Sequence, residues 1–180
     1  MVLRDYCNIL FLLLWTFTIS YSQETEVRCI NPQFDQLVDG YLDYSIPVIS
    51  VADAYESKDK YIFLDARELD EYNTSHIEQA THIGYNNFEV NSLKMIPKHA
   101  QIIIYCSIGY RSEKIGEVLK NNGFENVYNL YGSIFEWVNQ HHPVYDFNGN
   151  STFQLHTYNK KWSKWVEVEG VEKIWKDWKD

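Results

Sequence analysis

The chain has 180 residues, of which 45% are hydrophobic and 23% charged, and it carries a formal net charge of −9 at pH 7. This length supports one domain with a substantial core plus appended segments, and an acidic chain has no general attraction to nucleic acid. Zinc-binding spacings, Walker loops and dinucleotide-binding loops are absent from the sequence, so no metal or cofactor is expected.

Residues 1–22 have the pattern of a secretory signal peptide. Arg4 precedes the apolar run Ile9–Ile19, which is too short to span a bilayer comfortably, and Ser-Tyr-Ser at 20–22 fits a cleavage site. We therefore expect an exported protein, periplasmic or secreted. The alternative is a protein tethered to the membrane by an uncleaved N-terminal segment.

Residues 23–48 are predicted to form an N-terminal extension that contains Cys29. Within it, a short helix packed on the main domain is indicated by the helical spacing of Phe34, Leu37, Val38 and Tyr41. No motif surrounds Cys29, which gives it no assigned role.

The main domain is predicted to cover residues 49–146, preceded by a strand that starts at 47. Strands are expected at 47–49, 61–64, 81–83, 101–105 and 126–130, and helices at 51–56, 70–74, 112–121 and 134–140, while 88–96 fits neither pattern. This alternation predicts an α/β fold whose mostly parallel central sheet has helices on both faces. Ligands bind such sheets beyond the carboxyl ends of the strands.

Residues 147–180 are predicted to form a C-terminal Trp-rich extension. Two segments, 152–158 and 162–168, fit a β-hairpin. We expect the aromatic side chains to pack this extension against the domain, because buried aromatics contribute large apolar areas. The alternative is a ligand or partner surface made of tryptophans and lysines, namely Trp162, Trp165, Trp175, Trp178, Lys160, Lys161 and Lys164.

The segment QIIIYCSIGYRS at 101–112 is the most informative part of the chain. Its apolar run ends at Cys106, and Arg111 follows after four residues, where a helical pattern begins. A buried strand would thus deliver Cys106 to a loop before a helix N-terminus. Backbone N–H groups and the helix dipole there favour the thiolate, which predicts a nucleophilic sulfur in an anion-binding loop.

Four motifs in order resemble the rhodanese-like domain family, of the single-domain thiosulfate:thiol or cyanide sulfurtransferase type. They are FLDARELDEY at 63–72, HIEQATHI at 76–83, CSIGYR at 106–111 and NLYGSIFEW at 129–137. The chain departs from the family at turn positions, where Ser75, Glu78, Gln79 and Ser133 replace glycine or proline-glycine. The cysteine loop itself is intact.

The resemblance implies a rhodanese-like fold and a sulfurtransferase in which Cys106 is catalytic. Its thiolate would take a sulfane sulfur from a donor such as thiosulfate and pass it from a persulfide to a thiol or cyanide acceptor. The substrate-binding residues implied are those of the loop: Ser107, Ile108, Gly109, Tyr110, Arg111 and Ser112. Asp65 and Arg67 are implied as supporting residues.

Several roles stay open at this point. Arg111 could bind the anionic donor, or it could pair with a carboxylate and brace the loop. Ser112 is expected to cap the helix and could also contact the anion. For Asp65 and Arg67 we favour a hydrogen-bond network below the loop, because charged residues at strand ends are usually paired. Ile108 and Tyr110 are uncharged and leave the donor unidentified.

Two other functions compete with sulfur transfer. A phosphatase of the related dual-specificity kind would have five residues between the cysteine and the arginine, and the four present here disfavour it. A non-catalytic binding or thiol redox-partner module is the second alternative, because a fold does not guarantee turnover. In an exported chain, a structural or reversible disulfide between Cys29 and Cys106 is also possible.

Overall fold

A computed structural model describes residues 27–175 of the chain. The predicted signal segment at 1–22 and Trp178 therefore lie outside the described residues. Within 27–175, none of the helices has the length and apolar character that crossing a bilayer requires.

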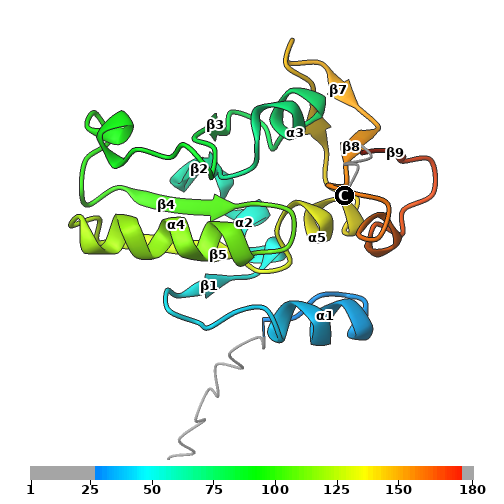
Figure 1. Ribbon diagram of the computed structural model, residues 1–180, viewed down its shortest axis with the longest axis horizontal. Helices are drawn as coiled ribbons and strands as arrows, with labels where there is room; N and C mark the ends of the chain where they lie inside the picture. The colour runs from blue at the N-terminus through cyan, green and yellow to red at the C-terminus, as the bar shows by residue number, and fades with distance from the viewer. Residues whose placement is uncertain (1–26, 176–180) are drawn as a thin grey trace, which may run out of the picture.

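A five-stranded parallel sheet forms the centre of the molecule, in the order β1-β5-β4-β2-β3 (Figure 1). The strands are β1 (Val48–Ile49), β2 (Ile62–Asp65), β3 (Thr81–His82), β4 (Gln101–Tyr105) and β5 (Asn126–Leu130). The central strand, β4, consists almost entirely of buried side chains, as its continuous apolar run predicts. Because the strands are parallel, their carboxyl ends lie at the same edge of the sheet, and Cys106 directly follows β4 at that edge.

Helices cover both faces of the sheet, which confirms the predicted α/β class. They are α1 (Pro32–Asp39), α2 (Val51–Glu56), α3 (Leu69–Thr74), α4 (Tyr110–Asn121) and α5 (Ser133–Asn139), with short 3-10 turns at η1 (Lys58–Lys60), η2 (Val90–Leu93) and η3 (Ser163–Trp165). Alternate residues of β4 enter two separate cores. Ile102 and Ile104 pack with α4, whereas Ile103 and Tyr105 pack with α2, α5 and α1.

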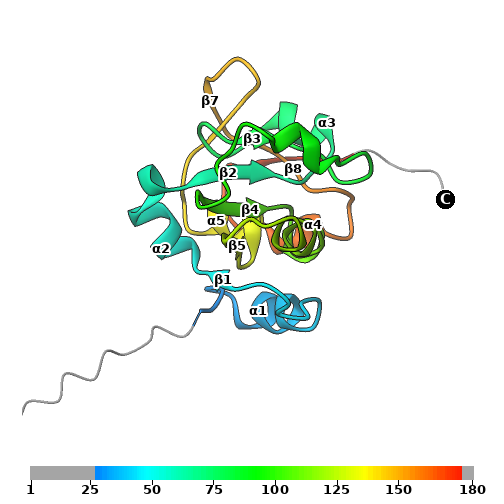
Figure 2. The ribbon, with the colours of Figure 1, turned by 90° about the vertical axis from the view of Figure 1, so that its left-hand side faces the viewer.

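The N-terminal extension forms the predicted short helix, α1, which lies beside β1 in both views (Figures 1 and 2). Asn31 caps the helix through its side chain, and Phe34 and Val38 are buried against the core. Tyr41 is 43% exposed, however, and Leu42 is buried in its place. The helix ends at Asp39, so the helical spacing does not continue to Tyr41.

The predicted hairpin in the C-terminal extension is wrong. Two short ladders form instead: β6 (Val144–Tyr145) pairs antiparallel with β7 (Ser151–Thr152), and β8 (Gln154–His156) pairs in parallel with β9 (Glu172–Ile174). The intervening segment folds onto the domain because Val166 is fully buried and the carbonyl of Trp165 accepts a hydrogen bond from the Asn139 side chain (2.8 Å).

Tryptophans of the extension pack on the main core, as expected. Trp162 and Trp165 are half-buried against it, and the Trp165 ring stacks on Phe34 of α1 with centroids 5.7 Å apart. Figure 1 shows the extension, in orange to red, beyond the edge where the arrow of β4 ends. Both appended segments therefore lie close to the loop that follows β4.

Candidate active site

A tight loop carries Cys106 from the end of β4 to the start of α4. Gly109 stands at the N-cap with φ +120°, a conformation that side chains rarely adopt, and a Cβ there would lie 3.2 Å from Leu42 Cδ2. This turn aims the N–H of Gly109 at Cys106 Sγ, 3.2 Å away. The positive φ therefore favours glycine here, and a side chain would also require Leu42 to shift slightly.

The N-terminus of α5 anchors the other side of the loop. The backbone N–H of Cys106 donates to Ser133 Oγ (3.0 Å). In return, Ile134 N donates to the carbonyl of Cys106 and Phe135 N to that of Ser107, both at 3.3 Å. Ser133, one of the departures from the family pattern, thus supplies an acceptor to the backbone of the predicted nucleophile.

Cys106 is only 1% exposed, yet its surroundings favour the thiolate. Burial alone raises the pKa of the Cys106 thiol. The charge of Arg111 and hydrogen bonding with Ser112 and Gly109 outweigh burial, so the pKa of this thiol lies below its ordinary value. The loop therefore stabilises a sulfur anion without exposing it to bulk water.

Arg111 is paired with a carboxylate that the sequence reasoning did not single out, Glu71 of α3. Arg111 Nη1 and Nη2 contact Glu71 Oε2 and Oε1 at 2.7 and 2.8 Å, and Nη2 also donates to Ser107 Oγ (3.0 Å). Two roles were left open for Arg111, and the structure shows the one in which it pairs with a carboxylate and braces the loop. Burial raises the pKa of Glu71, but Arg111 and Arg67 have the larger opposite effect and bring it down to about 2. The Glu71–Arg111 pair therefore stays charged over the neutral pH range.

Glu71 was missed because three acidic residues lie close together in ELDEY. One signal was available: Glu68 and Glu71 have the spacing of a capping box, and the backbone N–H of Glu68 does donate to Glu71 Oε2 (3.0 Å). A buried arginine also demands a buried carboxylate. Neither signal says which of the three carboxylates turns inward.

Asp65 and Arg67 form a fully buried pair below α3. Arg67 Nη2 lies 2.6 Å from Asp65 Oδ2 and donates to the carbonyl of Ser75, also at 2.6 Å. Ser75 directly follows α3, the helix that carries Glu71. The pair therefore links the end of β2 to the end of α3 and fixes the position of that helix on the sheet.

Ser112 does not cap α4, so that prediction is wrong. The helix begins two residues earlier, at Tyr110, because Gly109 can adopt the N-cap turn. The Ser112 hydroxyl instead lies 2.7 Å from Asn129 Oδ1 and 3.0 Å from the carbonyl of Gly109, and it also faces Cys106. Asn129, which was not predicted, braces the same carbonyl through Nδ2 (3.0 Å).

The predicted loop residues do not all point the same way. Cys106, Ser107, Gly109, Arg111 and Ser112 converge through the contacts above. The Ile108 side chain is instead buried in the core. The Tyr110 side chain is 43% exposed at the rim.

Both extensions cover the loop. Leu42 closes over Gly109, and the ring of Tyr41 meets the edges of Tyr110 and Trp162 at centroid distances of 6.4 and 5.6 Å. From the C-terminal extension, the ring of Tyr158 lies 5.5 Å from Arg111 Cζ. The aromatic rim of the site is thus assembled from three separate parts of the chain.

Cys29 lies apart from this chemistry. Cys29 and Cys106 are both free thiols in the described structure, so the disulfide considered between them is not present. Cys29 is buried, and a Cβ on Gly132 would come within 2.6 Å of its sulfur. Burial, reinforced by Glu136 and Asp35, raises the pKa of the Cys29 thiol far above its ordinary value, which makes it a poor nucleophile.

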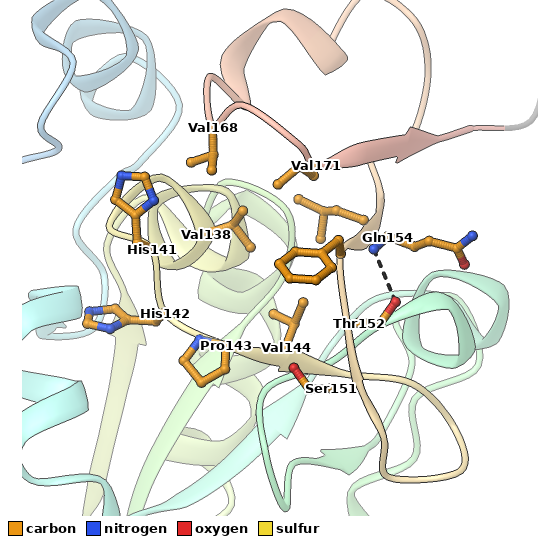
Figure 3. A pocket seen from close by; sticks show the side chains of 12 residues that line it. Val138, His141, His142, Pro143, Val144, Ser151, Thr152, Gln154, Val168 and Val171 are labelled. Atoms are coloured by element: carbon orange, nitrogen blue, oxygen red, sulfur yellow. Dashed lines mark hydrogen bonds between the residues drawn. The ribbon is translucent and has the colours of Figure 1, made fainter.

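A separate hollow of about 200 Å³ lies between α5, the β6–β7 ladder and the extension (Figure 3). Val138, Val144, Val168 and Val171 converge on it. Its lining holds neither a cysteine nor a carboxylate or ammonium group. Over residues 27–175, no cluster of three or more His, Cys, Asp or Glu side chains is placed to hold a metal ion.

Comparisons with known proteins agree on one family. The model of the Rhodanese-like domain matches residues 50–140. Thiosulfate sulfurtransferase GlpE from Coxiella burnetii is 33% identical over 104 residues, which cover 57% of this chain and 95% of the relative. The tRNA uridine(34) hydroxylase of Salmonella paratyphi B is 31% identical over 118 residues, covering 58% of this chain but 34% of the hydroxylase.

Solved structures support the fold. A protein from Bacillus halodurans aligns with a TM-score of 0.53 and 24% identity, over 66% of this chain and 89% of its own. Thiosulfate sulfurtransferase from Pseudomonas aeruginosa aligns with a TM-score of 0.51 and 18% identity, over 73% of this chain and 25% of its own. The family match covers residues 50–140, so α1 before it and the C-terminal extension after it lie outside the match.

Proposed function

The chain belongs to the rhodanese-like domain family, and on this premise we propose that it moves a sulfane sulfur from a small anionic donor such as thiosulfate to a thiol or cyanide acceptor. Cys106 is the nucleophile and carries the sulfur as a persulfide. The backbone N–H groups of Gly109 and Ser112 face the sulfur, and Arg111 supplies the positive charge that acts on it.

The proposed reaction consists of two displacements with no net oxidation. The Cys106 thiolate attacks the outer sulfur of thiosulfate, a sulfur–sulfur bond forms, the bond within the donor breaks, and sulfite leaves with the electron pair. An acceptor thiolate or cyanide then attacks the terminal sulfur and returns the electron pair to Cys106. The product is an acceptor persulfide or thiocyanate, and ping-pong kinetics follow because sulfite leaves before the acceptor reacts.

One observation carries the proposal: a buried thiol whose surroundings nevertheless favour its anion. The N–H of Gly109 lies 3.2 Å from Cys106 Sγ at the first turn of α4, and Arg111 together with the hydrogen bonds from Ser112 and Gly109 outweighs the effect of burial on the thiol pKa. Preorganised donors of this kind stabilise a sulfur anion without rearranging during the reaction. A structural cysteine in an apolar core has the opposite environment, as Cys29 shows.

Access to the sulfur requires motion. Because Cys106 is 1% exposed, a donor reaches it only when the side chains above the loop separate. The exposed rim residue Tyr110 carries no charge, so it adds no attraction for an anionic donor to that of Arg111 and the helix N-terminus.

Intact-mass spectrometry tests this function directly. The purified protein is incubated with thiosulfate, or with mercaptopyruvate, beside a Cys106→Ser variant. We expect a gain of about 32 Da on the wild type alone, followed by its loss when cyanide or a thiol is added. No gain from either donor, with Cys106 demonstrably reduced, would exclude sulfur transfer.

The enclosure of Cys106 specifically favours a second candidate, a non-catalytic binding or thiol redox-partner module. The domain also occurs inside relatives named for other reactions, such as the tRNA uridine(34) hydroxylase. Under this candidate, Cys106→Ser retains every cellular function and the wild type gains no sulfur.

We also propose that the protein is exported, on the pattern of residues 1–22. The expected mature chain begins at Gln23. N-terminal sequencing of the protein from the producing cells tests this, and a chain that begins at Met1 and sediments with membranes supports the uncleaved alternative.

A further inference from the structure

The C-terminal extension reaches the ion pair beside Cys106. The Tyr158 ring centroid lies 5.5 Å from Arg111 Cζ. Two residues earlier, the buried His156 is close enough to Glu71, Arg67 and Arg111 for their charges to act on its imidazole. Both residues follow position 140, where the family match ends, so this contact is an addition to the common domain.

The backbone around Tyr158 is held firmly in place. His156 belongs to β8, whose partner is β9, and the next residue, Thr157, donates its N–H to the carbonyl of Ile174 (2.7 Å). The N–H of Tyr158 donates to His156 Nδ1 (3.2 Å). Burial lowers the pKa of His156, which keeps the ring neutral and Nδ1 available as an acceptor at pH 7.

The ring of Tyr158 adds a contact to the Arg111 guanidinium beyond its hydrogen bonds. Its N–H groups already reach sideways to both oxygens of Glu71 and to Ser107 Oγ. An aromatic ring attracts a guanidinium placed over its face, and this attraction does not compete with hydrogen bonds in the guanidinium plane. Tyr158 therefore completes the surroundings of the one charge that most favours the Cys106 thiolate.

We propose that Tyr158 is a positioning residue of the sulfur-transfer site. Its backbone is tied to His156 and follows β8, and its ring holds Arg111 against Glu71 and beside Cys106. The inference deepens the proposed function and rests on it for its biological meaning. The C-terminal extension thereby becomes part of the active site rather than an appendage packed on the domain.

The test compares Tyr158→Phe with Tyr158→Leu through the pH dependence of Cys106 alkylation by iodoacetamide. The phenylalanine variant keeps the ring face and should match the wild type. The leucine variant should react about three- to tenfold more slowly near neutral pH, the range expected when a cation–π contact is lost. Phe153→Leu is the matched control, because Phe153 is a 77% exposed aromatic of the same extension and lines the separate hollow.

Two further measurements make the result decisive. Added to an Arg111→Gln background, Tyr158→Leu should have no further effect on the alkylation profile, because Tyr158 acts through Arg111. Tyr158→Met, which keeps a bulky apolar side chain without a ring, repeats the comparison if Tyr158→Leu melts early. An alkylation profile equal to the wild type in the folded leucine or methionine variant would overturn the proposal.

The alkylation readout also separates this inference from the proposed function. If the wild type never gains sulfur but Tyr158→Leu still slows alkylation, sulfur transfer fails and the positioning role stands. If the wild type gains sulfur and the variants alkylate normally, sulfur transfer stands and the positioning role fails. In an active enzyme, Tyr158→Leu should also lower kcat/KM for thiosulfate by the same factor, and Tyr158→Phe should retain the wild-type value.

Discussion

Replacing Arg111 with glutamine should have two separable consequences, one for reactivity and one for stability. Arg111 is the strongest of the influences that lower the pKa of the Cys106 thiol, and burial opposes it. Without the charge, burial prevails and the pKa rises. An opposite charge within about 4–6 Å typically shifts a pKa by about one unit or more, so alkylation of Cys106 at pH 7 should slow about tenfold or more.

The stability effect follows from Glu71. Its side chain is 3% exposed, and it faces Arg111 through two charge-assisted contacts of 2.7 and 2.8 Å. Removing one partner of a buried pair leaves an uncompensated charge and costs about 3–5 kcal/mol. For a domain of this size, that corresponds to a fall of about 6–20 °C in melting temperature.

A pair of control variants separates the two effects. The double variant Glu71→Gln/Arg111→Gln removes both charges and should recover much of the stability but none of the thiol reactivity. Arg111→Lys keeps the charge without the fork geometry and should lose stability while retaining most of the reactivity. Thermal melts by circular dichroism and iodoacetamide alkylation from pH 5 to 10 supply the data. If Arg111→Gln alkylates at the wild-type rate with the same midpoint pH, the electrostatic account of Cys106 is refuted.

Three further predictions concern the surroundings of the loop. The pKa of Glu71 falls on folding from its ordinary 4.5 to about 2. Its contribution of about 3 kcal/mol to the free energy of unfolding is therefore present above pH 4.5 and lost as the pH falls toward 2. Measured by urea unfolding at a series of pH values, the free energy of unfolding of Glu71→Gln should fall less steeply below pH 4.5. Gly109→Ala should destabilise by about 1–3 kcal/mol, because of φ +120° and a Cβ 3.2 Å from Leu42, and wild-type urea stability would contradict the turn geometry. Ser133→Ala should cost about 1–3 kcal/mol in the same assay, because the buried N–H of Cys106 loses its acceptor; an unchanged midpoint would show that another acceptor replaces it.

The sheet was the most predictable part of the fold. The strands at 101–105 and 126–130 were expected with the same bounds that the structure shows, because a short apolar run between turn residues has few alternatives in a parallel sheet. The start of α4 was missed by two residues. The pattern favoured a serine cap, whereas Gly109 supplies the turn through a positive φ that no side-chain pattern reveals.

Long-range pairing was the least predictable. The second strand of the extension was expected at 162–168, yet the partner of β8 is β9 and runs parallel to it. A hairpin is a local signal, whereas a parallel pair requires a distant segment whose position depends on packing in between. Glu71 was missed for a related reason, since its partner Arg111 lies 40 positions away in the chain. The predicted site thus contained the sulfur loop but not the helix and the extension that enclose it.

The enclosure of Cys106 has a consequence for biosynthesis. Chains emerge from the N-terminus, and the apolar cluster that packs around Cys106 is drawn from residues 46–127, before the C-terminal extension. Until α4 and β5 have packed on the sheet, the nascent thiol is open to oxidants and to wrong pairing with Cys29. In the finished fold both thiols are sequestered in separate surroundings. The part of the chain that places the sulfur therefore also shields it, before the C-terminal extension has been made.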